Sequence, residues 1–185
     1  MLDIYPSVKR WIPDLVTSSR GLCGPILLWG LTTHGPSMVW FWLFLLAICT
    51  DLVDGWLARK LGGTPWGKHL DPMADKLLTS CAWIGLYTSG VVPAWMVALM
   101  VTRDASLLVF GAIATLRSFT PPILHIGQIR VAIEGVALCV LLFVGPWIDV
   151  DWPTVGYTLA CMALCASLAS SIEFLTRWHR QHMAR

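Results

Sequence analysis

The chain has 185 residues, of which 56% are hydrophobic and only 13% are charged, whereas soluble globular domains carry roughly 25% charged residues. This composition excludes an ordinary soluble domain, a disordered chain and a fibrous repeat. The formal net charge of +2 is too small to indicate a nucleic-acid partner, and none is expected. We therefore expect an integral membrane protein whose residues 1–185 form a single helical domain.

Apolar stretches occur six times along the chain, at residues 13–31, 38–58, 72–88, 93–115, 129–147 and 154–174. In lipid every backbone polar group must be paired internally, so such stretches form either helices or a closed barrel. These are too long and too uninterrupted for barrel strands, and turn-forming residues such as His34-Gly35-Pro36 separate them. The sequence predicts an all-α integral membrane protein with six transmembrane helices.

The basic residues indicate how these helices are oriented. All 13 Lys and Arg residues fall in four regions: the N-terminal segment, the second-to-third connection, the fourth-to-fifth region and the C-terminus. With six spans these regions share one face, so the positive-inside rule places both termini in the cytoplasm. We expect the bacterial inner membrane, with the functional site on its cytoplasmic side. Residues 1–20 are polar and basic, so no cleavable signal peptide is expected.

Four aspartates stand out at the cytoplasmic ends of the second and third predicted helices. Asp51 and Asp54 share one face of the second helix, and Asp71 and Asp75 share one face of the third. Two antiparallel helices joined by a short turn would bring these faces together. Like charges stay close in a medium of low dielectric only when something neutralises them, and the nearby basic residues lie mainly off this face. Four carboxylates can hold two divalent ions, which we prefer to solvated helix caps.

The residues around these aspartates resemble the signature of the CDP-alcohol phosphotransferase family, D-x-x-D-G-x-x-A-R, a spacer, then G-x-x-x-D-x-x-x-D. All eight defining positions are present: Asp51, Asp54, Gly55, Ala58, Arg59, Gly67, Asp71 and Asp75. Residues 13–25 resemble the family's first helix, although Asp14 stands where Asn is usual. The six-span layout is similar too, so the likeness covers most of the chain.

The resemblance implies a transferase of phospholipid biosynthesis that moves the phosphatidyl group of CDP-diacylglycerol to an alcohol and releases CMP. It implies two Mg²⁺ or Mn²⁺ ions on Asp51, Asp54, Asp71 and Asp75, with Asp75 also the catalytic base for the acceptor hydroxyl. It further implies contact with membrane lipids and a homodimer. The residues that it implies for CDP binding are Asp54, Gly55, Ala58, Arg59, Thr64 and Gly67.

The acceptor site is expected at Arg103, Arg117 and Arg130, which can clamp a phosphate or, alternatively, anchor lipid head groups. Arg103-Asp104 resembles the Arg followed by an acid in the family's fourth helix. Asp at this place is more similar to eukaryotic-type cardiolipin synthases than to most phosphatidylglycerophosphate synthases. We therefore expect a glycerol-type acceptor, either phosphatidylglycerol or glycerol 3-phosphate, with inositol phosphate or serine as alternatives.

The start of the fifth helix departs from the family pattern. Related enzymes have Lys-hydrophobic-x-Thr-x-x-Gln, whereas this chain has Gln128 at the Lys position and Glu134 at the Gln position. Either Arg130 substitutes for the absent Lys, or the acceptor lacks the phosphate position that Lys serves. Glu134 lies inside a predicted span, and we expect it to pair with an Arg, the alternative being contact with an acceptor hydroxyl.

Three other classes have to be weighed against this interpretation. A divalent-cation transporter would place its carboxylates near the membrane midplane between repeats, whereas these aspartates lie beside the basic edge and occur once. A prenyltransferase with Asp-rich metal sites is closer in chemistry, but it does not account for Gly55, Ala58 and Arg59. An EF-hand is excluded because its ligands alternate along one loop and end in a distant Glu.

Overall fold

The computed structural model describes residues 5–61, 67–116, 125–143 and 151–183, with side chains at 17–50, 72–109, 129–143, 151–173 and 176. These residues form helices and no strand, so the predicted all-α class is confirmed. The helices are α1 (Tyr5–His34), α2 (Met38–Leu61), α3 (Gly67–Thr88), α4 (Ala94–Leu116), α5 (His125–Leu142) and α6 (Trp152–Met183). Most extend beyond the apolar stretches that predicted them, because a polar turn can continue a helix once the apolar part has ended.

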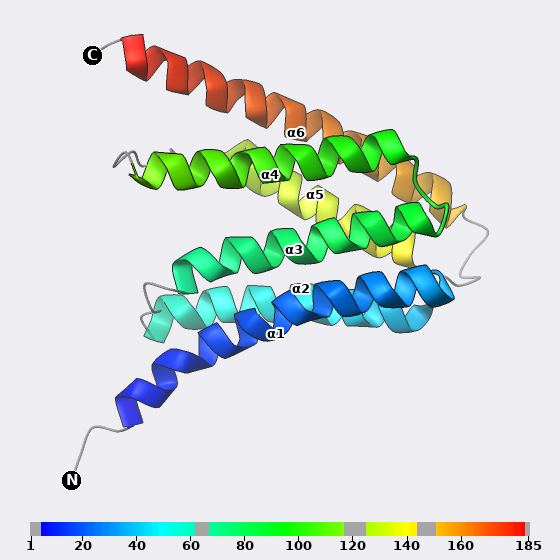
Figure 1. Cartoon of the computed structure of the whole chain (residues 1–185), viewed down its shortest axis with the longest axis horizontal. Coiled ribbons are helices and arrows are strands. Elements are labelled where there is room, and N and C mark those ends of the chain that lie inside the picture. The colour runs from blue at the N-terminus through cyan, green and yellow to red at the C-terminus, as the bar shows by residue number, and fades with distance from the viewer. Residues whose placement is uncertain (1–4, 62–66, 117–124, 144–150, 184–185) are drawn as a thin grey trace.

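Successive helices alternate in direction (Figure 1). The first turn of α1, the end of α2, the start of α3, the end of α4, the start of α5 and the last turn of α6 lie on the left in Figure 1. We call this the terminal end of the bundle and the opposite one the distal end. Among the basic residues of the described helices, Lys9, Lys60, Lys68 and Arg180 lie within two turns of a helix end at the terminal end.

Glycine and proline end the helices at the distal end. Gly35 follows α1 with a φ of 72°, a left-handed conformation that glycine adopts without strain, and its N–H donates to the Leu31 carbonyl oxygen at 3.0 Å. Gly90 closes α3 in the same way, with a φ of 75°. Pro93 then precedes α4, where its missing N–H costs nothing. These stops produce the short connections that make neighbouring helices antiparallel.

The core is a continuous apolar layer to which all six helices contribute. Its fully buried members include Leu27, Phe44, Leu78, Met100, Leu138 and Ala160. Helix α1 packs along α3 and also against α2, while α5 packs along α6. Helix α6 approaches α5 closely because it presents small residues there: Gly156 lies against Leu141, and Ala160 and Ala163 are fully buried. Gly156, Ala160 and Ala163 therefore serve packing within the chain.

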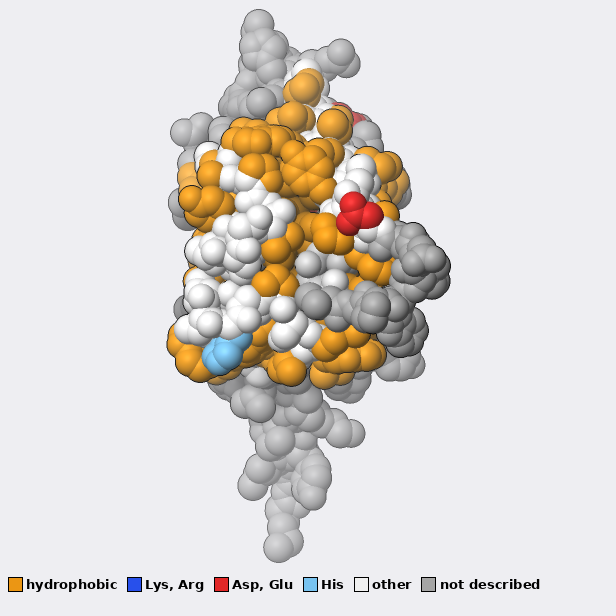
Figure 2. All heavy atoms as spheres, turned by 90° about the vertical axis from the view of Figure 1, so that its right-hand side faces the viewer, with side chains coloured by type: hydrophobic (Ala, Val, Ile, Leu, Met, Phe, Trp, Pro, Cys, Tyr) orange, Lys and Arg blue, Asp and Glu red, His pale blue; other side chains and the backbone are white. Residues whose placement is uncertain are grey.

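Charge and hydropathy are unevenly distributed between the two ends. Figure 2 looks onto the distal end, where hydrophobic side chains cover most of the described surface and no Lys or Arg among the described residues is visible. Within the described part of the chain, one segment, Trp152–Glu173, combines the length and the mean hydropathy (1.6) needed to cross a membrane. Met38–Thr50 is a shorter apolar segment. The described surface also exposes large apolar side chains such as Trp29, Trp42 and Trp95.

Candidate active site

The four aspartates lie at similar depths from the terminal end. At the α-helical rise of about 1.5 Å per residue, Asp51 and Asp54 lie about 15 and 10 Å before the end of α2. By the same rise, Asp71 and Asp75 lie about 6 and 12 Å after the start of α3. The helices thus carry both pairs to one level of the bundle. The side chains of Asp51, Asp54 and Asp71 lie outside the described residues, so their convergence stays a prediction.

The other residues expected to bind CDP also fall outside the described side chains. Gly55, Ala58 and Arg59 belong to α2 and Gly67 begins α3, while Thr64 lies in a segment that the structure does not describe. Among the described side chains, no three Asp, Glu, His or Cys groups come close enough to hold a metal ion. The side chains of three predicted ligands, Asp51, Asp54 and Asp71, are not among those described. The carboxylate chemistry of the four aspartates fits a hard divalent cation.

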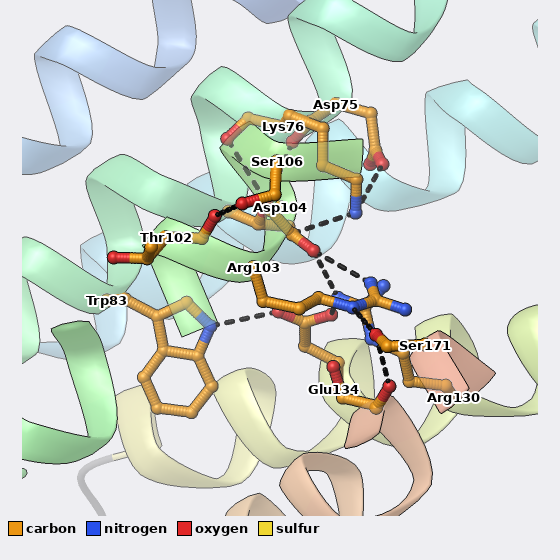
Figure 3. Close-up of polar contacts among 12 residues, drawn as sticks. Asp75, Lys76, Trp83, Thr102, Arg103, Asp104, Ser106, Arg130, Glu134 and Ser171 are labelled. Atoms are coloured by element: carbon orange, nitrogen blue, oxygen red, sulfur yellow. Dashed lines mark hydrogen bonds and ion pairs between the residues drawn. The ribbon is translucent and has the colours of Figure 1, made fainter. Parts of the chain in front are cut away.

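Of the four aspartates predicted to bind metal, which we call the aspartate quartet, Asp75 is the one whose side chain the structure describes. Its carboxylate is partly accessible, with 33% of the side chain exposed, and its Oδ2 lies 3.9 Å from Lys76 Nζ. Lys76 Nζ lies closer, at 2.9 Å, to Oδ2 of Asp104 on α4. Lys76 therefore connects the aspartate quartet to a second group of charges deeper in the bundle (Figure 3).

Asp104 is the centre of this second group. Besides Lys76, its carboxylate accepts from Arg103 on α4 at 2.9 Å and from Arg130 on α5 at 2.8 Å, both at Oδ1. The Asp104 and Arg130 side chains are almost completely buried, with 5% and 3% exposed. Because buried charges are costly unless paired, one carboxylate facing three cations holds α3, α4 and α5 together at this level.

Glu134 completes the charge cluster from the other side of Arg130. Its Oε2 accepts from Arg130 one helical turn earlier on α5, which confirms the expected pairing with an Arg. Its Oε1 accepts from the indole N–H of Trp83 on α3 at 3.1 Å. Both side chains are buried. Arg103 also donates from Nε to the Ser171 hydroxyl on α6 at 3.3 Å, so four helices meet here.

The structure brings Arg103 and Arg130 together through Asp104, whereas Arg117 lies outside the described residues. The sequence analysis counted Lys76 among the basic residues lying mainly off the carboxylate face and did not predict its contact with Asp104, nor did it predict the role of Trp83. A lysine directly after the last aspartate of the motif was the available signal for Lys76. Trp83 gave none, because a tryptophan in an apolar helix is ordinarily a packing residue.

A small open pocket of about 190 Å³ lies beside this site, between α1 and α3. Ala74, next to Asp75, forms part of it, and nearly all of its lining surface is apolar. None of its described lining residues carries a charge that could neutralise a diphosphate. Its lining residues are Thr17, Ser18, Gly21, Met73, Ala74 and Leu77.

Comparison with known proteins places the chain in a family. A Bacillus subtilis protein named CDP-diacylglycerol–glycerol-3-phosphate 3-phosphatidyltransferase is 52% identical over 63 residues, 34% of this chain and 33% of that protein. A Drosophila melanogaster protein named "probable cardiolipin synthase (CMP-forming)" is 36% identical over 117 residues, 60% of this chain and 35% of that protein. A Mycobacterium tuberculosis protein named "probable phosphatidylglycerophosphate synthase" is 36% identical over 143 residues, 73% of this chain and 68% of that protein.

The chain thus spans about a third of the length of the first two relatives and about two thirds of the third. The names of these relatives differ in the acceptor, so the similarities do not select one. The family model described as CDP-alcohol phosphatidyltransferase matches residues 10–173, which is most of the chain and includes both aspartate pairs and the Asp104 cluster. The chain belongs to the CDP-alcohol phosphatidyltransferase family.

Proposed function

We propose that this protein transfers the phosphatidyl group of CDP-diacylglycerol to the hydroxyl of a glycerol-type acceptor and releases CMP. The acceptor is phosphatidylglycerol, giving cardiolipin, or glycerol 3-phosphate, giving phosphatidylglycerophosphate. The observation that carries the proposal is the complete family motif on α2 and α3, which Lys76 connects to a charge cluster with three cations on α3, α4 and α5. A donor diphosphate and an acceptor phosphate both need such neighbouring positive charge.

In this proposal the aspartates divide the chemistry between them. Asp51, Asp54, Asp71 and Asp75 hold two Mg²⁺ or Mn²⁺ ions, which when bound neutralise the diphosphate and stabilise the charge on departing CMP. Asp75 accepts the proton of the acceptor hydroxyl, whose oxygen bonds to the phosphatidyl phosphorus as the bond from phosphorus to CMP breaks. Its partial exposure supports this role, because a general base must be reachable by its substrate.

The remaining nucleotide and acceptor contacts follow the family motif. Gly55 and Ala58 leave room for cytidine on α2, and Asp54, Gly67, Arg59 and Thr64 complete the CDP site. Arg103 and Arg130 bind the acceptor phosphate, together with Arg117. The short distances that join Arg103 and Arg130 to one carboxylate support this part, since the two guanidinium groups are held side by side.

We further propose that all six helices span the bacterial inner membrane with both termini in the cytoplasm, so that the active site opens on the cytoplasmic side. The alternation of helix directions in Figure 1 and the absence of visible Lys or Arg among the described residues of the distal end in Figure 2 support this orientation. A homodimer, which family membership suggests, must use a surface other than the α6 face buried against α5.

An assay of the full chain in detergent micelles tests the proposed activity. With CDP-diacylglycerol and Mg²⁺ or Mn²⁺, we expect CMP release with phosphatidylglycerol or glycerol 3-phosphate, and EDTA should abolish it until metal is restored. Asp75→Asn should lower turnover by at least about a hundredfold, the contribution typical of a general base. Asp151→Asn, an exposed change at the distal end, is the matched control and should leave turnover unchanged.

Two results would contradict the proposal in different ways. Absence of CMP release with every acceptor in a panel that also includes inositol phosphate and serine would overturn the activity. Near wild-type turnover by Asp75→Asn with metal present would overturn only the assignment of Asp75 as the base. Chromatography of the lipid product identifies which acceptor was used.

A further inference from the structure

At the proposed acceptor site, each cation already forms an ion pair with a carboxylate of the chain, which binding a phosphate does not require. Lys76, Arg103 and Arg130 supply three positive charges, and Asp104 and Glu134 supply two negative charges. Every one of these cations contacts a carboxylate before any substrate is present. The cluster therefore has a net charge of +1 with which to attract an anion. Asp75 is not counted here because it is assigned to the metal site.

Glu134 is the unusual member of the cluster. Asp104 lies between the three cations and joins the helices, whereas Glu134 adds a second carboxylate to Arg130 alone. Trp83 holds the other oxygen of Glu134 at 3.1 Å, so the carboxylate cannot turn away when a ligand approaches. Only 2% of the Glu134 side chain is exposed, so solvent screens its charge weakly.

The two guanidinium groups are consequently not equivalent toward a ligand. Arg130 is 3% exposed and already shared between two carboxylates, while Arg103 is 10% exposed and contacts Asp104 and Ser171. An acceptor phosphate would therefore meet Lys76 and Arg103, with 16% and 10% of their side chains exposed, before Arg130, whose guanidinium also contacts Glu134 (Figure 3). A phosphate monoester, with a charge of about −1.5 to −2 at pH 7, is repelled more strongly by the charge of Glu134 than a diester, which carries a single charge.

We propose that Glu134, oriented by Trp83, is a specificity-determining residue that makes this site prefer an acceptor whose phosphate is a diester over one with a phosphate monoester. The inference rests on the proposed function and refines its acceptor. It favours a phospholipid head group of the phosphatidylglycerol type over glycerol 3-phosphate. Of the two alternatives at Gln128, this proposal favours the second, in which the acceptor lacks the phosphate position that the lysine of related enzymes serves.

The test compares kcat/KM for short-chain phosphatidylglycerol and for glycerol 3-phosphate, using the full chain in detergent with CDP-diacylglycerol and Mn²⁺. The wild type should prefer the diester. Glu134→Gln keeps the size of the side chain and an oxygen for Trp83 but removes the charge. It should shift the ratio of the two kcat/KM values toward the monoester by about tenfold, as loss of one poorly screened charge predicts. Comparing ratios cancels differences in how the two acceptors reach the enzyme.

Trp83→Phe is the matched control, because it removes the indole N–H and retains the charge of Glu134. It should shift the ratio toward the monoester in the same direction as Glu134→Gln but by less, about threefold at most, because the charge of Glu134 stays and only the charge-assisted hydrogen bond that orients it is lost. A wild-type preference for glycerol 3-phosphate overturns the inference without any variant being needed. An equal effect of Glu134→Gln on both acceptors also overturns it, since a purely structural role has that signature. Absence of CMP release with any acceptor instead overturns the proposed function itself.

Discussion

At the scale of single residues, the decisive feature is one carboxylate facing three cations. Asp104 contacts Lys76, Arg103 and Arg130 at 2.8 to 2.9 Å, and 5% of its side chain is exposed. A buried ion pair often adds little to stability compared with apolar residues, but removing one partner leaves an uncompensated charge. Removal of Asp104 takes one shared carboxylate away from three cations at once, and it leaves Arg130 with Glu134 alone and Lys76 with Asp75 at 3.9 Å.

We therefore expect Asp104→Asn to lower the free energy of unfolding by about 3 to 5 kcal/mol, the cost of breaking a buried pair. The melting temperature in detergent, followed by near-ultraviolet circular dichroism, measures the loss. Asp151→Asn is the control: Asp151 is exposed before α6, and Asn caps a helix about as well as Asp. Equal melting temperatures for the two variants would contradict the central role of Asp104.

At the scale of helices, close approach between α1 and α3 depends on glycine. A Cβ atom added at Gly85 would lie 2.6 Å from Leu31 Cδ1 and 2.9 Å from Leu31 Cβ, which is shorter than any normal contact. The Ser89 hydroxyl donates to the Leu31 carbonyl oxygen at 3.0 Å one turn later, so the two helices are fixed at this spacing. Helix α3 carries Asp75 and Lys76, and its position on α1 therefore affects the site as well as the core.

Replacing Gly85 by alanine should lower stability by about 1 to 3 kcal/mol, because overpacking forces neighbouring side chains or backbone to shift. Gly135→Ala on α5 provides a matched control, since its nearest contact would be Ile48 Cδ1 at an ordinary 3.6 Å. That change should be neutral or stabilising by up to about 1 kcal/mol, the difference in helix propensity. Thermal unfolding in detergent compares the two. A loss of stability in the control alone would show that the contact at Gly85 is not limiting.

At the scale of the whole molecule, the two ends of the bundle differ in chemistry. Lys76 and Arg130 lie in the terminal halves of α3 and α5, whereas the visible distal surface is mostly hydrophobic among the described residues. A membrane protein inserted by the positive-inside rule keeps basic regions in the cytoplasm. The proposed orientation follows from this difference and can be measured directly.

Single cysteines placed at His34 and Thr176, in a chain whose six natural cysteines are replaced, should react differently in intact bacterial cells. Both positions are exposed, one at the distal end of α1 and one in the final part of α6. A membrane-impermeant maleimide should label His34→Cys in intact cells and Thr176→Cys only after permeabilisation. The reverse pattern would invert the topology, and labelling of both in intact cells would exclude an even number of spans.

Much of this architecture was predictable because its signals are local. Apolar runs, turn residues and the placement of Lys and Arg predict helices and their orientation without knowledge of any long-range contact, and the helical class is confirmed. The spacing of Asp51 with Asp54 and of Asp71 with Asp75 likewise needs only helix geometry and the family motif. The pairing of Arg130 with Glu134 was predictable for the same reason, since the two residues are one helical turn apart.

What the sequence could not determine depends on contacts between distant parts of the chain. Trp83 and Glu134 are separated by 51 residues, and neither residue type by itself predicts the hydrogen bond that orients the carboxylate. The meeting of Lys76, Arg103 and Arg130 on Asp104 likewise required three helices to pack at particular rotations and depths. Helix rotation is set by close packing of many small contacts across the whole core, so only the tertiary structure decided which charges neutralise one another.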